Sequence, residues 1–228
     1  EAFLNSIFYC FYMLCYLEGY GIMHKHKLKE KLKQQQLDVL QYQLNPHFLF
    51  NSLNSIRGML YEDVSEAKKL LLEFRQLFKH HFDNKQHCIA LKQELLLCRH
   101  YLKLEKVRFE ERLNVDLKVP SECEIMLVPS MSIFTLIENA IKHGIGQIPS
   151  GGTIAISVAK QDKKLSITVS NPINKTARQA DGTRTGLANL EARLALLYRD
   201  NFTINSERSD DQFSVELQIP LKKDKTGE

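Results

Sequence analysis

The 228-residue sequence has few of the residues that mark fibrous, disordered or disulfide-bonded proteins. Only ten Gly and six Pro are present, while 43% of the residues are hydrophobic. This composition excludes a collagen-like or low-complexity chain and allows one large or two small cores. The five Cys are an odd set without any Cys-x-x-Cys pair, so neither a disulfide framework nor a zinc ribbon is predicted. Reduced thiols favour a cytoplasmic location for the body of the protein.

The excess of positive over negative charge is also small. The net charge is +4, and residues 24–33 hold five Lys against one Glu, which accounts for the whole excess. A basic surface spread over the molecule, as nucleic-acid binding requires, is not indicated. We predict no direct contact with nucleic acid.

An uncharged stretch rich in aromatic residues lies at the start, in residues 2–17. As a helix it would rise about 24 Å, less than the ~30 Å hydrocarbon core of a bilayer. Residues 1–23 are therefore predicted to be the C-terminal part of a transmembrane helix, with the lysines that follow as its cytoplasmic flank. An amphipathic or core helix is the alternative, because Asn5, Ser6 and Glu18 interrupt the apolar run.

Residues 24–113 are predicted to be helical. Their first part has an imperfect heptad pattern, which can transmit a register shift from a membrane helix. The residues of this seam are Leu28, Leu32, Gln35, Val39 and Tyr42. Two more helices are predicted at residues 64–82 and 91–113, with a polar loop at residues 83–87 between them. Because an exposed apolar seam needs a partner helix, we predict that this region forms a homodimer.

Strand patterns appear only after residue 113. Three runs alternate apolar and polar residues, which predicts an antiparallel sheet with one covered and one solvated face. The runs span residues 154–158, 165–169 and 213–219. Helices predicted near residues 130–143 and 187–198 supply the cover. The predicted fold class is α+β, with the helical module followed by an α/β sandwich at residues 114–228.

The helix predicted around residues 43–60 carries a histidine opposite its apolar stripe. Its polar face holds His47, Asn51 and Asn54, and its apolar face holds Leu49, Leu53, Ile56 and Leu60. We therefore expect His47 to point outward and Pro46 to cause a bend just before it. A neutral imidazole near pH 7 has a free lone pair and can attack a phosphoryl group. On this geometry alone, an inert surface histidine is the more common outcome.

The sequence around His47 reads Leu-Asn-Pro-His-Phe-Leu-Phe-Asn-Ser-Leu-Asn. It closely resembles the NPHFLFN phosphoacceptor motif of the LytS-type sensor histidine kinases, with seven consecutive matches. The resemblance implies autophosphorylation of His47 in a dimeric helical module at the cytoplasmic membrane of a bacterium. Many histidine kinases have an acidic residue directly after the phosphorylated histidine. Phe48 occupies that position here, so a neighbouring base would come from elsewhere in the chain.

A second string, Leu-Ile-Glu-Asn-Ala-Ile-Lys-His-Gly at residues 136–144, resembles the N-box of the GHKL ATPase fold. On a helical wheel its apolar residues share one face, and Glu138, Asn139, Lys142 and His143 share the other. Taken alone, this is also the pattern of an ordinary amphipathic helix. The resemblance implies that ATP and Mg²⁺ bind here, that Asn139 binds the metal and that Glu138 polarises the attack. Lys142 and His143 are expected to offset phosphate charge.

Asn171 ends a predicted strand where the family's first glycine box has an Asp that contacts adenine. No Gly follows it. An amide can still accept a hydrogen bond from the adenine amine while it donates one to a ring nitrogen. The polar residues 174–184 that follow are predicted to form a lid over the nucleotide.

Residues 182–190 resemble the second glycine box of the same fold, in which small residues let backbone N–H groups approach phosphates. Gly182, Gly186 and Leu187 match the pattern, and Arg184 replaces the middle glycine. Arg184 is expected either to contact phosphate or to close the loop. A P-loop string is absent from the sequence, which excludes a P-loop NTPase.

The segment between the two motifs carries a further pattern of the family. Its residues are Glu94, Tyr101, Leu102, Glu105, Arg108 and Phe109. We interpret them as core packing plus an ion pair between helices.

Together these observations predict the cytoplasmic core of a membrane-bound sensor histidine kinase. By resemblance, its partner is a response regulator with a LytTR-type domain. Asn171 and Arg184 leave open a second class, a signalling scaffold that has lost phosphoryl transfer. A freestanding GHKL ATPase is a third alternative.

Overall fold

The computed structural model describes residues 46–83, 86–174 and 185–222. Within these ranges no helix combines the length and apolar character that crossing a membrane requires. The predicted transmembrane segment, the heptad seam and nearly all of the predicted lid lie outside the described residues, as does the bend expected before His47.

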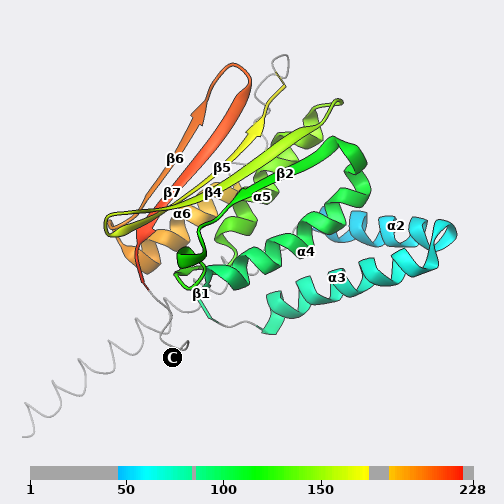
Figure 1. The fold of residues 1–228 in the computed structure, drawn as a ribbon, viewed down its shortest axis with the longest axis horizontal. Coiled ribbons are helices and arrows are strands. Elements are labelled where there is room, and N and C mark those ends of the chain that lie inside the picture. The colour runs from blue at the N-terminus through cyan, green and yellow to red at the C-terminus, as the bar shows by residue number, and fades with distance from the viewer. Residues whose placement is uncertain (1–45, 84–85, 175–184, 223–228) are drawn as a thin grey trace, which may run out of the picture. The chain divides into compact units, whose positions relative to one another are not determined.

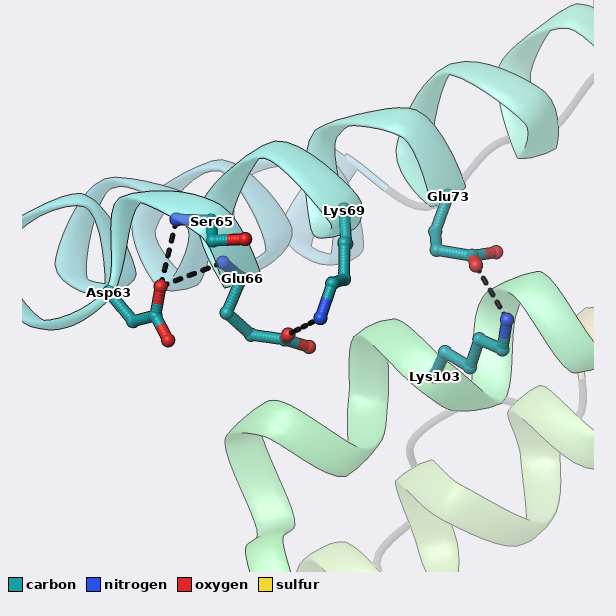
Figure 2. A network of polar contacts seen from close by, with 6 residues as sticks. All are labelled: Asp63, Ser65, Glu66, Lys69, Glu73 and Lys103. Carbon is teal, nitrogen blue, oxygen red and sulfur yellow. Dashed lines mark hydrogen bonds and ion pairs between the residues drawn. The ribbon is translucent and has the colours of Figure 1, made fainter.

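The first two described helices form an antiparallel hairpin (Figure 1). Helix α2 spans Pro46–Glu62 and α3 spans Val64–Asp83. Pro46 takes the first position of α2, where a missing N–H costs no hydrogen bond. The single residue between the helices, Asp63, caps α3 because its Oδ1 accepts hydrogen bonds from the backbone N–H groups of Ser65 at 2.8 Å and Glu66 at 3.0 Å (Figure 2). The hairpin can therefore reverse direction over one residue.

Helix α4, Leu91–Phe109, packs against both α3 and α2. Glu73 of α3 forms an ion pair with Lys103 at 2.6 Å (Figure 2), and its carboxylate is also hydrogen-bonded to the ring of His100. The helix ends four residues before the predicted end at Leu113, in a short 3₁₀ turn at Glu110–Arg112. Glu110 has a φ of 51° there, a left-handed conformation that an α-helix cannot contain.

The buried face of α2 differs from the prediction. Phe48 is 5% exposed and Ile56 is 7% exposed, whereas Leu53 and Leu60 are 43% and 49% exposed. The predicted stripe is therefore wrong at Leu53 and Leu60. The physical reason for this difference is the aromatic ring of Phe48, which packs against Tyr101 of α4 and turns the adjacent face of α2 inward.

The main sheet has five strands in the order β2-β4-β5-β7-β6. They are β2 (Leu113–Lys118), β4 (Gly152–Gln161), β5 (Lys164–Pro172), β6 (Thr203–Arg208) and β7 (Gln212–Pro220). The three strands predicted from alternation, β4, β5 and β7, are confirmed and pair antiparallel. The sheet also contains a strand that was not predicted, β2, which pairs parallel to β4 and makes the sheet mixed. A separate pair joins β1 (Cys88–Ala90) to β3 (Leu127–Pro129).

Helices α5 (Ser132–His143) and α6 (Thr185–Tyr198) cover the sheet (Figure 1). The core lies between them and the inward side chains of the central strands, including Ile154, Ile167 and Leu217, all fully buried. The α+β fold class is confirmed. The boundary near Leu113 stays a prediction, and α4 packs against elements on both sides of it, α3 and α5.

Candidate functional site

A buried carboxylate from α4 caps the N-terminus of α5, the helix that carries most of the predicted site. Glu94 of α4 is fully buried, and its two carboxylate oxygens accept hydrogen bonds from the backbone N–H groups of Met131 at 2.8 Å, Ile133 at 3.0 Å and Phe134 at 3.1 Å. These donors form the N-terminus of α5, where a negative charge is favourable. Burial raises the pKa of Glu94, while these hydrogen bonds and the charge of Arg193 oppose the rise. Glu94 therefore fixes α4 to the start of α5.

Helix α5 divides as its wheel predicts. The apolar residues of the predicted stripe are all at most 1% exposed. They are Ile133, Leu136, Ile137, Ala140 and Ile141. On the other face, Glu138, Asn139 and His143 are half-buried, and Lys142 is exposed. Burial lowers the pKa of His143, and the neighbouring Lys142 charge lowers it further. An uncharged imidazole beside a lysine can donate a hydrogen bond to an anion without a second full charge.

The structure brings Asn171 to the C-terminal end of this face. Asn171, on β5, is 3% exposed, and its Nδ2 donates a hydrogen bond to the Pro172 carbonyl at 2.8 Å. A Cβ on Gly144, directly after His143, would lie 2.2 Å from that Nδ2, so only glycine fits beside it. A carboxylate at position 171 could not donate to the Pro172 carbonyl. The amide therefore has a structural role that the family's Asp would not perform.

The start of α6 faces the same helix from another side. A Cβ built on Gly186 would lie 3.8 Å from Cγ2 of Thr135, which is one turn before Asn139 on α5. Gly186 is exposed and Leu187 is half-buried. Gly182 and Arg184 lie outside the described residues. Three predicted segments, far apart in the sequence, thus meet along α5.

His47 lies in the first turn of α2, but its side chain is outside the described side chains. The next residue, Phe48, contacts Tyr101 of α4, with ring centroids 4.9 Å apart. Tyr101 in turn packs on Phe134 of α5 at 4.7 Å. The sequence analysis did not predict this contact, although a large aromatic residue directly after His47 indicated that one was possible.

The ion pair expected between helices lies within one helix. Arg108 and Glu105 of α4 are 2.5 Å apart, at a spacing of three residues. Burial raises the pKa of Glu105 while Arg108 opposes the rise, and the charge of Glu138 on α5 adds to it. The interpretation as core packing is confirmed, since Tyr101 and Phe109 are both buried. The role of Glu94 as a cap was missed. Its signal was a charged residue on an otherwise apolar helix face.

The oxygen-bearing side chains on the polar face of α5 suit a metal ion that is already bound to a nucleotide. Among the described residues, no group of three His, Cys, Asp or Glu side chains could hold a metal by itself. Magnesium bound to a nucleotide keeps waters and phosphate oxygens and needs only one or two protein oxygens. The half-buried side chain of Asn139, beside Glu138, fits that requirement.

Comparison with known proteins shows what the chain resembles. Residues 35–113 match the family model described as Histidine kinase. Sensor histidine kinase BtsS of Escherichia coli (strain K12) is 28% identical over 195 residues, covering 85% of this chain and 35% of that protein. Sensor protein LytS of Staphylococcus epidermidis is 30% identical over 207 residues, with the same two coverages. The sensor histidine kinase/phosphatase LytS of Staphylococcus aureus (strain Mu50) is 32% identical over 206 residues, covering 84% and 35%.

The chain is thus similar to the LytS-type sensor histidine kinases, and the resemblance predicted from its two motifs is confirmed. It spans about a third of the length of these relatives. A solved histidine kinase domain from Erythrobacter litoralis EL346 aligns with 84% of this chain and 96% of its own, at 17% identity and a TM-score of 0.44.

Proposed function

We propose that this chain is the kinase core of a sensor histidine kinase in a two-component system. It transfers the γ-phosphoryl group of ATP to His47 and then to an aspartate of a response regulator. The observation that carries the proposal is the gathering of three segments along α5. Asn171 lies at one end, Gly186 lies opposite Thr135, and the polar face of α5 lies between them.

The chemistry needs positioning and charge neutralisation more than a strong base. A lone pair on a neutral His47 imidazole attacks the γ-phosphorus, the bond from phosphorus to the β–γ bridging oxygen breaks, and ADP leaves with that electron pair. Glu138 orients the imidazole and takes up its proton. Lys142 offsets the phosphate charge, and the uncharged imidazole of His143 donates a hydrogen bond to a phosphate oxygen. Asn139 supplies an oxygen ligand to Mg²⁺, which neutralises charge on the triphosphate.

The remaining predicted residues hold the nucleotide. The oxygen of Asn171 accepts from the adenine amine, since its Nδ2 already donates to Pro172. Gly182, Gly186 and Leu187 bring the start of α6 close to the phosphates, where backbone N–H groups favour an anion. Arg184 contacts the phosphates from the loop before α6.

The helical hairpin supports a homodimer. Phe50 of α2 is 64% exposed, and Leu71 and Leu72 of α3 are 52% and 55% exposed. Apolar residues gathered on one hairpin of a single copy are typical of a surface that a second copy covers. We further propose that residues 1–23 anchor the chain in the cytoplasmic membrane of a bacterium, that the kinase core faces the cytoplasm, and that the response regulator is of the LytTR type.

Labelling with γ-³²P-ATP and Mg²⁺ tests the proposal. The chain should acquire an acid-labile, base-stable label. His47→Gln should abolish the label and leave the nucleotide dissociation constant within about twofold of wild type, since the imidazole adds little to ground-state binding. His100→Gln, on α4 and outside the proposed site, is the matched control and should label normally. Loss of ATP binding in His47→Gln would contradict the role assigned to this residue.

The competing scaffold function is favoured by one observation. Asn171 is almost fully buried and its amide nitrogen is occupied by Pro172. If wild type binds no ATP in calorimetry and takes no label, the scaffold stands and the kinase proposal fails. Steady hydrolysis without retained label would instead indicate a freestanding ATPase.

A further inference from the structure

Three aromatic rings, one from each of three helices, form a continuous stack. Phe48 of α2 lies 4.9 Å from Tyr101 of α4, and Tyr101 lies 4.7 Å from Phe134 of α5, measured between ring centroids. The ring planes are tilted by 57° and 54°, a favourable geometry for aromatic pairs. All three residues are at most 5% exposed. Tyr101 is therefore held between the proposed phosphoacceptor helix and the proposed nucleotide-binding helix.

The stack also reaches the proposed catalytic carboxylate. Burial raises the pKa of the Tyr101 hydroxyl, and the charges of Glu105 and Glu138 raise it further. Glu138 lies one helical turn after Phe134, the α5 residue on which Tyr101 packs. Phe48 directly follows His47 in the sequence. Tyr101 thus contacts the residue after the phosphoacceptor, and its partner on α5 lies one turn before the residue proposed to orient the phosphoacceptor.

The stack forms within a single chain. Asp63 reverses the path between α2 and α3, and Glu73 ties α3 to α4 through Lys103 and His100. These contacts bring α2 back along the α4 helix of its own chain. A partner chain is not needed to place Phe48 on Tyr101.

We infer that Tyr101 docks the phosphoacceptor helix of each chain on that chain's own nucleotide-binding helix, so that phosphoryl transfer occurs within one chain. The inference rests on the proposed function. Tyr101 and Phe48 are positioning residues in this scheme. They align His47 with the γ-phosphate and make no contact with the nucleotide. Loss of the stack lowers the rate of transfer and leaves nucleotide binding unchanged.

Mixed dimers test the direction of transfer. Chains with His47→Gln and chains with Asn139→Ala, distinguished by tags of different size, are co-expressed and the mixed dimers purified. Transfer within a chain predicts no label in this dimer, because neither chain holds both an intact acceptor and an intact nucleotide site. A dimer of wild type with the double variant His47→Gln/Asn139→Ala should label on the wild-type chain only. Label on the Asn139→Ala chain would overturn the inference.

The stack itself is tested at saturating ATP. Phe48→Leu should lower the initial labelling rate roughly 3- to 10-fold, the range in which one aromatic pair contributes, with the ATP dissociation constant within about twofold of wild type. Tyr101→Phe keeps the ring and should label at the wild-type rate, whereas Tyr101→Leu should resemble Phe48→Leu. Because the two rings act as one contact, the double variant Phe48→Leu/Tyr101→Leu should be little slower than either single variant.

Phe202→Leu is the matched control, since it removes a half-buried ring that packs elsewhere on the core. It should label at the wild-type rate. An unchanged or faster rate in Phe48→Leu would overturn the inference, the faster rate by showing that the stack holds the helix back. Failure of wild type to label would instead defeat the proposed function, so the two failures are distinguishable.

Discussion

Helix α5 and the α2–α3 hairpin use apolar residues in different ways. In α5, every apolar residue of the predicted stripe is at most 1% exposed, and the opposite face is polar. In the hairpin, one apolar face is buried against α4, while Phe50, Leu60 and Leu72 are 64%, 49% and 55% exposed. The α/β region therefore completes its own core within one chain. The hairpin carries a second apolar face that its own chain does not cover.

The largest expected effect contrasts one residue from each region. Ile137→Asp places a charge in the core under the sheet and should cost more than about 4 kcal/mol of unfolding free energy, because a buried unpaired charge is not compensated. Leu72→Asp is the matched variant on α3, and should cost less than about 1 kcal/mol because its side chain is already half in solvent. Urea denaturation measures both.

The same pair of variants separates folding from association. Leu72→Asp should shift the chain from dimer to monomer in light scattering while keeping its folded circular dichroism spectrum. If Leu72→Asp unfolds the chain, the hairpin depends on this face for its own stability and the contrast between the regions is lost. If it stays dimeric, the second copy binds elsewhere.

A smaller effect is expected where the two regions join, at Glu94. Glu94→Ala leaves the N–H groups of Met131, Ile133 and Phe134 without their buried acceptor and should cost about 3 kcal/mol, since each unsatisfied buried donor costs about 1–3 kcal/mol and some of these gain water. Glu94→Gln keeps an acceptor oxygen. Because burial raises the pKa of Glu94, a neutral side chain also avoids part of the desolvation cost.

Glu94→Gln should therefore lose less than half as much unfolding free energy as Glu94→Ala. Thermal denaturation of both variants at one pH checks the ratio. Equal losses would mean that the charge acting on Arg193, and not the hydrogen bonds to α5, accounts for the effect.

The same comparison explains what the sequence could predict. A helical wheel identifies the buried face of α5 because only one of its faces is apolar. In α2 the large apolar residues form one wide arc, with Phe48 toward one edge, Leu53 toward the other and Ile56 between them, so the wheel cannot show which part of the arc is buried. The choice depends on a tertiary contact, the packing of Phe48 on Tyr101.

The other features that were not predicted join residues that lie far apart in the sequence. Strands β4, β5 and β7 alternate clearly and were predicted, whereas β2 was missed, although its six residues also alternate between apolar and polar types and half of them are exposed. Its parallel pairing with β4 joins segments almost forty residues apart. Among the site residues, the polar face of α5 could be predicted from local sequence. The cap by Glu94 and the closeness of Gly144 to Asn171 depend on long-range packing that no local pattern encodes.

The smallest expected effect concerns the polar contacts of Glu73, which join α3 to α4. Burial raises the pKa of Glu73, but hydrogen bonds from Lys103 and His100 outweigh it and hold the pKa below its ordinary value. A carboxylate with a lowered folded-state pKa adds stability above its unfolded pKa of about 4.3 and loses it as pH falls through the folded value. Glu73→Gln should thus cost about 0.5 kcal/mol at pH 7 and progressively less below about pH 4.

Glu66→Gln is the control on the same helix, because Glu66 pairs with Lys69 of α3 itself, at 2.9 Å (Figure 2). An exposed pair within one helix contributes about 0.3–0.5 kcal/mol and does not join two elements. Hydrogen exchange separates the two variants where unfolding free energy alone does not. Glu73→Gln should speed exchange of the α3 amides as the hairpin detaches from α4, and leave those of α5 unchanged. Faster exchange throughout both helices would show that the hairpin and the α/β region open as one unit.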